Sequence, residues 1–210
     1  MAATDAIEKE LEARDPDVKL MLQVRDEVPG AFETLVERYQ ERLLGILAHL
    51  IGGDPAAAED LAQEVFLRVY RARKGYRPRA KFSTWLFTIA NNVALNHLRS
   101  KGRDPSVPFG DRSDSQTFRP SESSVLSTEG TPSAQMRQAE LSEVVREALA
   151  TLGEDQKMAV LLNKFEEMSY AEIAEVMGKS EAAVKSLLAR ARMNLRDRLG
   201  PYLRTGQRGA

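Results

Sequence analysis

The sequence predicts an all-α protein in which two small helical domains are joined by a flexible linker. Apolar residues recur every three or four positions almost throughout, and we find no segment with the period-2 alternation of a strand. A polar segment rich in Ser, Pro and Gly, residues 102–134, separates the two periodic regions. The chain has 210 residues, which is enough for two small domains with modest cores.

Charge is distributed unevenly along the chain. The formal net charge is only −1, yet the span Val65–Arg103 holds ten basic residues and no Asp or Glu, a net of +10 (ten minus zero). The N-terminal region is rich in acids instead, as in IEKELEARDPD. A solvated helix face usually mixes both signs, so this asymmetry indicates a surface that meets a polyanion.

Several classes of protein are disfavoured. There is no cysteine, so disulfides and thiolate metal sites are excluded. The N-terminus is too polar for a signal peptide, and no apolar run approaches the roughly 18 residues of a membrane span. We therefore expect a soluble cytoplasmic protein without membrane insertion. His49 and His97 are isolated and no P-loop or metal-ligand cluster is found, so we expect no enzyme, no cofactor and no metal.

Residues 29–101 are predicted to form the first domain, after a polar, mobile N-terminal arm over residues 1–28. An apolar stripe from Phe32 to Leu47 indicates its first helix, which the GGDP sequence at residues 52–55 ends. A second helix is expected over residues 56–73. The third is KFSTWLFTIANNVALNHLR, residues 81–99.

The third helix is predicted to have an apolar and a polar face. At 100° per residue, the inward face consists of Phe82, Leu86, Ile89 and Val93. The polar residues that point away, with Asn96 at the boundary, are Thr84, Thr88, Asn91, Asn92 and Arg99. The only tryptophan, Trp85, lies beside the apolar face, which favours core packing for it, although a stacking role stays open.

Residues 135–204, which follow the linker, are predicted to form the second domain. Ser169 and Glu172 have the spacing of a capping box, so a helix should begin at Tyr170. Gly178 supplies a tight turn, and Ser180 can cap the next helix. This is the spacing of a helix-turn-helix.

The helix after the turn is expected to enter a DNA major groove with its N-terminal turns. Helix-turn-helix segments also occur in proteins that never bind DNA. A basic excess supports DNA binding here, because residues 178–208 hold eight basic and two acidic residues, a net of +6. The side chains offered to bases or phosphates are Ser180, Glu181, Ala183, Lys185, Ser186, Arg190 and Arg192.

Three blocks carry a resemblance to a known family: AEDLAQEVFLRVYR, FSTWLFTIANNVALNHLR and EDQKMAVLLNKFEEMSYAEIAEVMGKSEAAVKSLLARAR. In this order, with a polar linker between them, they resemble a bacterial RNA polymerase sigma factor of the extracytoplasmic-function (ECF) group of the sigma-70 family. The resemblance implies a promoter-specificity subunit with a region 2-like helical bundle for the −10 element. A region 4-like helix-turn-helix domain would bind the −35 element.

The resemblance also implies residues for each contact. Docking to core RNA polymerase is carried over to Asp60, Gln63, Glu64, Phe66 and Tyr70. Without the family, a solvated acidic stripe would be the favoured interpretation of these residues. Recognition of the −10 element and strand opening are carried over to Tyr76, Arg77, Arg79, Lys81, Thr84, Trp85, Thr88, Asn92, Asn96 and Arg99. These supply a basic loop, polar donors and an aromatic ring, which an unstacked base and its backbone require.

The implied partners are core RNA polymerase, promoter DNA and an anti-sigma factor. The chain departs from the family at Leu187, where many relatives have a basic residue, and in its long, proline-rich linker. Two other classes compete with this interpretation. A response-regulator-like transcription factor would have an α/β receiver domain, and a helical scaffold protein would not require two acid-poor basic stretches.

Overall fold

The structure, a computed structural model, describes residues 2–101 and 132–205. Within these ranges the chain forms nine α-helices and one short 3-10 helix, with no strand, and the predicted all-α fold is confirmed. The α/β receiver of the response-regulator alternative is therefore missing from the described residues. Residues 102–131 of the predicted linker lie outside the described ranges, and a helix begins at Pro132.

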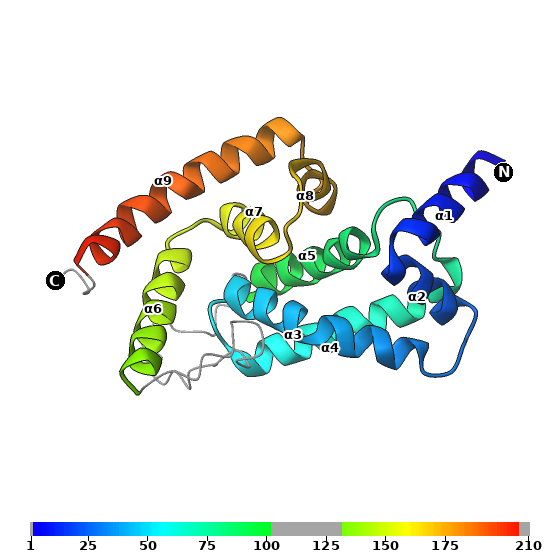
Figure 1. Cartoon of the computed structure of the whole chain (residues 1–210), viewed down its shortest axis with the longest axis horizontal. Coiled ribbons are helices and arrows are strands. Elements are labelled where there is room, and N and C mark those ends of the chain that lie inside the picture. Colours follow the sequence, from blue (N-terminus) through cyan, green and yellow to red (C-terminus); the bar gives the residue numbers. More distant parts are fainter. Residues whose placement is uncertain (1, 102–131, 206–210) are drawn as a thin grey trace. The chain divides into compact units, whose positions relative to one another are not determined.

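The helices divide into two compact units, the first of which contains α1 to α5 (Figure 1). Their bounds are α1 Ala2–Arg14, α2 Pro16–Arg25, α3 Ala31–Ile51, α4 Pro55–Ala72, the 3-10 helix η1 Arg73–Gly75, and α5 Phe82–Lys101. The helices α3, α4 and α5 pack on one another, and α2 packs against α3 and α5. The core includes Leu35, Leu43, Val65, Phe82 and Leu86, each of which is fully buried.

The expectation of a mobile arm over residues 1–28 is wrong for the part of it that forms α2. The helix α2 begins at Pro16, a residue suited to the first turn, after Asp15 as its N-cap. Val18 and Met21 on this helix are fully buried, and Leu22 and Val24 are nearly so. The apolar residues of VKLMLQV form this buried face. The segment around them is rich in charged residues, so its overall composition did not indicate a core helix. The helix α2 is thus part of the first unit's core.

The second unit contains α6, α7, α9 and the first half of α8. Their bounds are α6 Pro132–Ala150, α7 Glu154–Phe165, α8 Tyr170–Met177 and α9 Glu181–Thr205. The helices α6 and α7 both pack against α9. Val184, Leu188 and Ala191 of α9 are buried, as the helical spacing of the sequence requires. None of the described helices has the length and apolarity needed to cross a bilayer.

Candidate functional site

The loop before α5 and the polar side of α5 hold the residues predicted to meet the −10 element. Six of the ten predicted side chains are exposed, and these are Arg77, Arg79, Lys81, Asn92, Asn96 and Arg99. On α5 the spacing of Thr88, Asn92, Asn96 and Arg99 by four, four and three residues places them along one stripe. This stripe and the basic loop form a surface with cations and amide groups but no acid of its own.

Two of the predicted residues lie in the core instead of on this surface. The side chains of Tyr76 and Thr84 are 4% and 0% exposed. Thr84 shares the buried side of α5 with Phe87, and Asn91, which was also predicted to point outward, is only 5% exposed. The helical wheel placed both polar residues on the wrong face because α5 is buried over a wider arc than its aliphatic residues indicate. In this conformation neither side chain can touch DNA.

Tyr76 belongs to an aromatic cluster beneath the loop. Its ring centroid lies 4.8 Å from that of Trp85 and 6.5 Å from that of Phe82, and Phe82 lies 5.2 Å from Tyr39. Tilted and edge-on rings at these distances attract one another. Trp85 is half-buried at the edge of the cluster, 5.9 Å from Phe82. Its prediction as a boundary residue agrees with this position.

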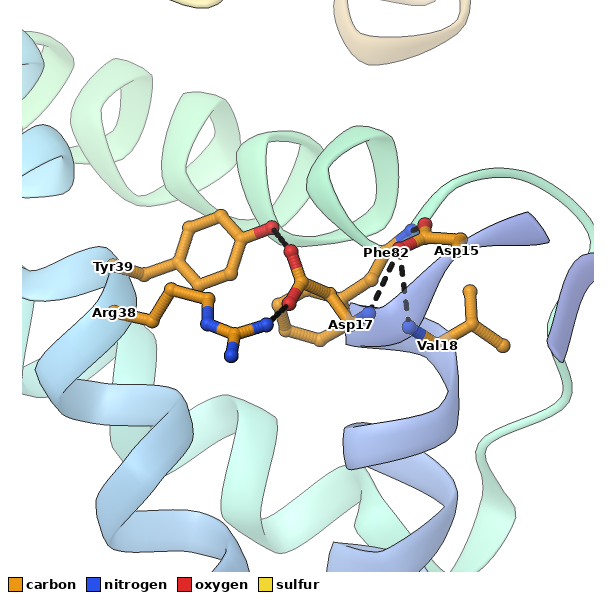
Figure 2. Close-up of polar contacts among 6 residues, drawn as sticks. All are labelled: Asp15, Asp17, Val18, Arg38, Tyr39 and Phe82. Carbon is orange, nitrogen blue, oxygen red and sulfur yellow. Dashed lines mark hydrogen bonds and ion pairs between the residues drawn. The ribbon is translucent and has the colours of Figure 1, made fainter. Parts of the chain in front are cut away.

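An acidic residue that the sequence did not single out joins the starts of two helices. The carboxylate of Asp15 accepts hydrogen bonds from the amides of Asp17 (2.9 Å) and Val18 (3.4 Å) in the first turn of α2 (Figure 2). Its other oxygen accepts from the amide of Phe82, 2.9 Å away at the start of α5. One side chain thus satisfies amides of two helix N-termini, which otherwise have no partners within their own helices.

Asp17 attaches α2 to α3 in the same region. Its carboxylate accepts a 2.5 Å hydrogen bond from the hydroxyl of Tyr39 and also pairs with Arg38 (Figure 2). Burial, reinforced by the hydrogen bond to Asp17, raises the pKa of Tyr39 above its usual value. Burial likewise raises the pKa of Tyr76, and the negative charges of Asp15 and Glu8 add to the effect.

A charged cleft of about 460 Å³ adjoins the loop and is lined by Glu8, Arg25, Asp26, Lys74 and Arg77. The guanidinium of Arg25 bonds Glu8 at 2.8 Å, which attaches α1 to α2. Arg77 donates to the carbonyl of Tyr76 at 3.1 Å. The cleft therefore contains one residue that we predicted to meet DNA, Arg77, among side chains that bond one another.

The residues predicted to dock on polymerase lie on α4, but they do not all reach its surface. Asp60 and Gln63 are exposed, and Glu64 is half-exposed and pairs with Arg68 at 2.6 Å. Phe66 is only 9% exposed and packs into the core, so it does not share their face. Tyr70 is 43% exposed, with its ring 5.0 Å from that of Phe32 and the guanidinium of Arg73 lying 3.8 Å above it.

Leu67 is a surface residue of α4 that we did not predict. Its side chain is 49% exposed, and it follows Gln63 by four residues and precedes Tyr70 by three. These spacings place Gln63, Leu67 and Tyr70 on one face of the helix. An exposed leucine beside an exposed tyrosine provides apolar contact area between polar neighbours, as interface centres do. The position of Leu67, four residues after Gln63, is the sequence feature that could have identified it as part of this face.

The helix-turn-helix of the second unit forms as predicted. The Ser169 hydroxyl and amide both bond Glu172 Oε2, at 2.7 and 2.8 Å, and the Glu172 amide returns a 3.3 Å bond to Ser169 Oγ. This reciprocal capping box starts α8 at Tyr170. Gly178 has a φ of +61° at the turn, and Ser180 Oγ accepts from the amide of Ala183 at 3.2 Å.

The start of α9 presents its predicted DNA-binding side chains to solvent. Six of them are exposed, namely Ser180, Glu181, Lys185, Ser186, Arg190 and Arg192, and Ala183 is half-buried. Arg192 donates to the hydroxyl of Tyr170 at 3.0 Å, which joins α9 to α8. Leu187 is also half-buried, so it contributes to packing as well as to the surface.

The fold and the charge distribution together define a class of protein. It is all-helical in its described residues, with two units, and each unit carries a helix whose exposed face is polar and basic. Comparisons with known proteins identify the family. Models of sigma-70 region 2 and sigma-70 region 4 match residues 35–104 and 142–195.

Curated relatives match nearly the whole chain. The chain is 34% identical over 191 residues to the RNA polymerase sigma-H factor of Pseudomonas aeruginosa, which covers 91% of this chain and 97% of the relative. It is 32% identical over 189 residues to the ECF RNA polymerase sigma-E factor of Escherichia coli strain K12, covering 90% and 96%. The chain belongs to the ECF group of the sigma-70 family, the promoter-specificity subunits of bacterial RNA polymerase.

Solved structures share the fold. The structure of CnrH in complex with the cytosolic domain of CnrY matches with a TM-score of 0.63 at 24% identity, over 89% of this chain and 99% of that chain. The sigma factor RpoE from Bartonella quintana, solved in complex with the anti-sigma factor NepR, matches with a TM-score of 0.63 at 23% identity. This second match covers 81% of this chain and 98% of that chain.

Proposed function

We propose that the exposed face of α4 docks on core RNA polymerase and that the loop at residues 76–81, with the polar stripe of α5, reads the −10 element. The start of α9 reads the −35 element. The single observation that carries this assignment is the acid-free span Val65–Arg103, within which Arg77, Arg79 and Lys81 are exposed on the loop and Asn92, Asn96 and Arg99 are exposed along one stripe of α5. A duplex that is being opened needs cations along its backbone and donors at its base edges.

The docking face consists of Asp60, Gln63, Leu67 and Tyr70, with Glu64 at its edge. It combines carboxylate and amide groups with apolar area, which suits a protein partner more than a polyanion. Phe66 is left out because it is buried. The protein then acts as a dissociable subunit that selects promoters while polymerase performs synthesis.

The −10 surface consists of Arg77, Arg79 and Lys81 on the loop and the stripe from Thr88 to Arg99 on α5. Cations of the loop hold the displaced strand, and the amides of Asn92 and Asn96 bond base edges. Trp85 is half-exposed at the edge of the aromatic cluster, and in this proposal its ring stacks on a base.

The −35 surface consists of the exposed side chains in the first turns of α9. Lys185 and Ser186 are exposed and are assigned to base edges, and Arg190 and Arg192, exposed a turn or two further along, are assigned to phosphates. The function places the protein in the cytoplasm with polymerase and DNA. It shares its fold with the sigma factor RpoE, which was solved in complex with the anti-sigma factor NepR, and this supports an anti-sigma factor as a third partner.

Reconstituted transcription tests the assignment. The protein is mixed with sigma-free core polymerase and a promoter library, and initiated transcripts are sequenced. We expect Asp60→Ala with Gln63→Ala to weaken binding to core while the remaining complexes select the same promoters. We expect Asn92→Ala with Asn96→Ala to slow promoter opening at unchanged affinity for core.

Two outcomes contradict the assignment. If no promoter-dependent transcript appears while a control sigma factor supports synthesis, the proposed function is wrong. If the two double variants lose core binding and promoter opening to the same extent, the surfaces are not separate and the residues act through the fold. Lys185→Ala serves as the matched variant in the second unit, and we expect it to reduce only the dependence on the −35 element.

A further inference from the structure

The loop at residues 76–81 is held at both ends by acidic residues of the N-terminal segment. At its start, Glu27 bonds Arg73 at 3.2 Å and Lys74 at 3.0 Å in η1. These bonds lower the pKa of Glu27, the contact with Lys74 most of all. At its end, Asp15 accepts the amide hydrogen of Phe82 at 2.9 Å (Figure 2). The position of the loop therefore depends on residues far away in sequence.

The contact at the end of the loop is the stronger of the two. The Glu27 pairs are more than half exposed on the glutamate side, so solvent weakens them. The Asp15 bond is partly buried and joins a carboxylate to a backbone amide. No local side chain can replace it, because the residue at the cap position of α5 is Lys81, whose carbonyl receives the amide of Trp85 and whose ammonium cannot accept a hydrogen bond.

Within the loop the side chains alternate between core and solvent. Tyr76 and Pro78 are buried, whereas Arg77, Arg79 and Lys81 are exposed. The Tyr76 hydroxyl is buried and has no hydrogen-bond partner among the described residues, so ring packing holds that residue. A rotation of the first turn of α5 would move Lys81 and, through it, the two arginines. The Asp15 bond opposes that rotation.

We propose that Asp15 is a positioning residue for recognition of the −10 element: by capping α2 and α5 with one carboxylate, it fixes the basic loop in the orientation that reads promoter DNA. Asp15 does not need to touch DNA. It ties the N-terminal helix pair to the reading surface, so a change in α1 or α2 alters promoter choice through this residue. The inference rests on the proposed −10 surface.

An asparagine at position 15 separates the two roles of the carboxylate. Asparagine caps a helix about as well as aspartate, so its single oxygen can serve the amides of α2. Its NH2 group then faces the Phe82 amide, donor against donor, and that bond is lost. Asp15→Asn therefore keeps the local cap and removes the remote one. Hydrogen exchange at the Phe82 amide, compared with that of Val18, verifies this in the full-length protein.

The readout is the −10 discrimination ratio of holoenzyme, the rate of open-complex formation on a preferred promoter divided by that on the same promoter with a substituted −10 element. Both rates are measured with the same holoenzyme preparation. A loss of folded protein therefore lowers both rates by the same factor and leaves their ratio unchanged. For Asp15→Asn we expect the ratio to fall about three- to tenfold, since losing one hydrogen bond shifts a conformational equilibrium by about that factor. The corresponding −35 ratio should not change.

Two controls run in parallel. Asp54→Asn makes the same substitution at a cap that serves only its own helix, through the amide of Ala57 at 3.2 Å, and should leave both ratios unchanged. Asn92→Ala with Asn96→Ala tests the underlying −10 assignment. If this pair lowers the −10 ratio and Asp15→Asn leaves it unchanged, the positioning role is refuted. If neither the asparagine pair nor Asp15→Asn lowers the −10 ratio, the proposed −10 surface itself is wrong, and the positioning role of Asp15 falls with it.

Discussion

The helices that we assign to the two promoter elements begin in different ways. The helix α9 begins with a cap from its own sequence, since Ser180 accepts from the amide of Ala183 three residues later. The helix α5 begins with a cap from Asp15, which precedes Phe82 by 67 residues. A local cap stabilises one helix wherever that helix lies, whereas a remote cap also fixes where the helix lies. The −10 surface is thus tied to the rest of its unit by a remote helix cap, whereas side-chain contacts join α9 and the turn before it to α7 and α8, from Lys179 to Asp155 and from Arg192 to Tyr170.

The same contrast extends to the helix that precedes α9. The capping box of α8 is closed between Ser169 and Glu172, over three residues. In the first unit the corresponding charges reach across elements, from Asp17 of α2 to Arg38 and Tyr39 of α3. Strand opening requires a reading surface that holds its shape against the cost of unstacking bases, which is a few kcal/mol. Connections between distant segments supply that rigidity.

The largest expected effect comes from removing the remote cap altogether. Asp15→Ala deletes the cap of α2 and the bond to α5, so we expect the free energy of unfolding of the first unit to fall by about 2–3 kcal/mol. Trp85 is the only tryptophan and lies in this unit, so urea unfolding followed by its fluorescence reports the first unit separately. Ser180→Ala, with an expected cost of about 1 kcal/mol in the second unit, should leave this transition unmoved.

A transition in Asp15→Ala that coincides with that of the parent protein would show that the remote cap contributes nothing to stability. A shift in the tryptophan transition of Ser180→Ala would show instead that the two units do not unfold separately. Either result removes the distinction between local and remote capping. The measurement uses the full chain, so both transitions come from the same sample.

The difference between the two caps also explains what the sequence could predict. Capping motifs, the Gly178 turn and the apolar spacing of α3, α4 and α9 are local patterns, and all of them are confirmed. The roles of Asp15 and α2 depend on contacts across the chain, so local patterns did not identify them. Thr84 and Tyr76 were misplaced for a related reason, because burial by a neighbouring helix widens a core face beyond its aliphatic residues.

The exposed face of α4 also shows that a local sequence pattern does not determine which side chains the fold buries. Asp60 and Gln63 are exposed as helical spacing indicates, but Phe66 turned inward and Leu67 outward. Both are apolar residues in the middle of α4, and composition alone does not say which of two neighbours the core takes. Core residues are mostly apolar, but an apolar residue need not be buried, and exposed leucines are common. The family resemblance supplied the function, and the structure supplied the choice of side chains.

An intermediate loss of stability is expected when the second remote contact of α2, the hydrogen bond from Tyr39 to Asp17, is removed. Tyr39→Phe removes the 2.5 Å bond to Asp17 and should cost about 1 kcal/mol at neutral pH. Above pH 10 a second effect appears. Unfolded tyrosines lose their protons near pH 10, whereas burial raises the pKa of Tyr39 and Tyr76 in the folded protein. The unfolded state then binds fewer protons, so stability falls as the pH rises.

Urea unfolding at pH values from 8 to about 11.5, followed by Trp85 fluorescence, measures this fall. We expect a shallower fall in Tyr39→Phe, because one of the two protected hydroxyls is gone. Tyr76→Phe is the matched variant: its hydroxyl has no partner among the described residues, so it should flatten the alkaline fall with little loss at neutral pH. Parallel profiles for parent and both variants would show that neither hydroxyl is protected.

The smallest expected effect tests the local cap and separates it from DNA recognition. Asparagine caps helices as well as serine, so Ser180→Asn should change the stability of the second unit by less than about 0.5 kcal/mol. Hydrogen exchange at the Ala183 amide should stay at the parent rate, which differs from the loss of protection expected at Phe82 in Asp15→Asn. If Ser180 also contacts the −35 element, Ser180→Asn lowers or changes −35 discrimination without any change in that exchange rate. Faster exchange at Ala183 would mean that even this cap depends on more than its own three residues, and the contrast between the two helices would then be one of degree.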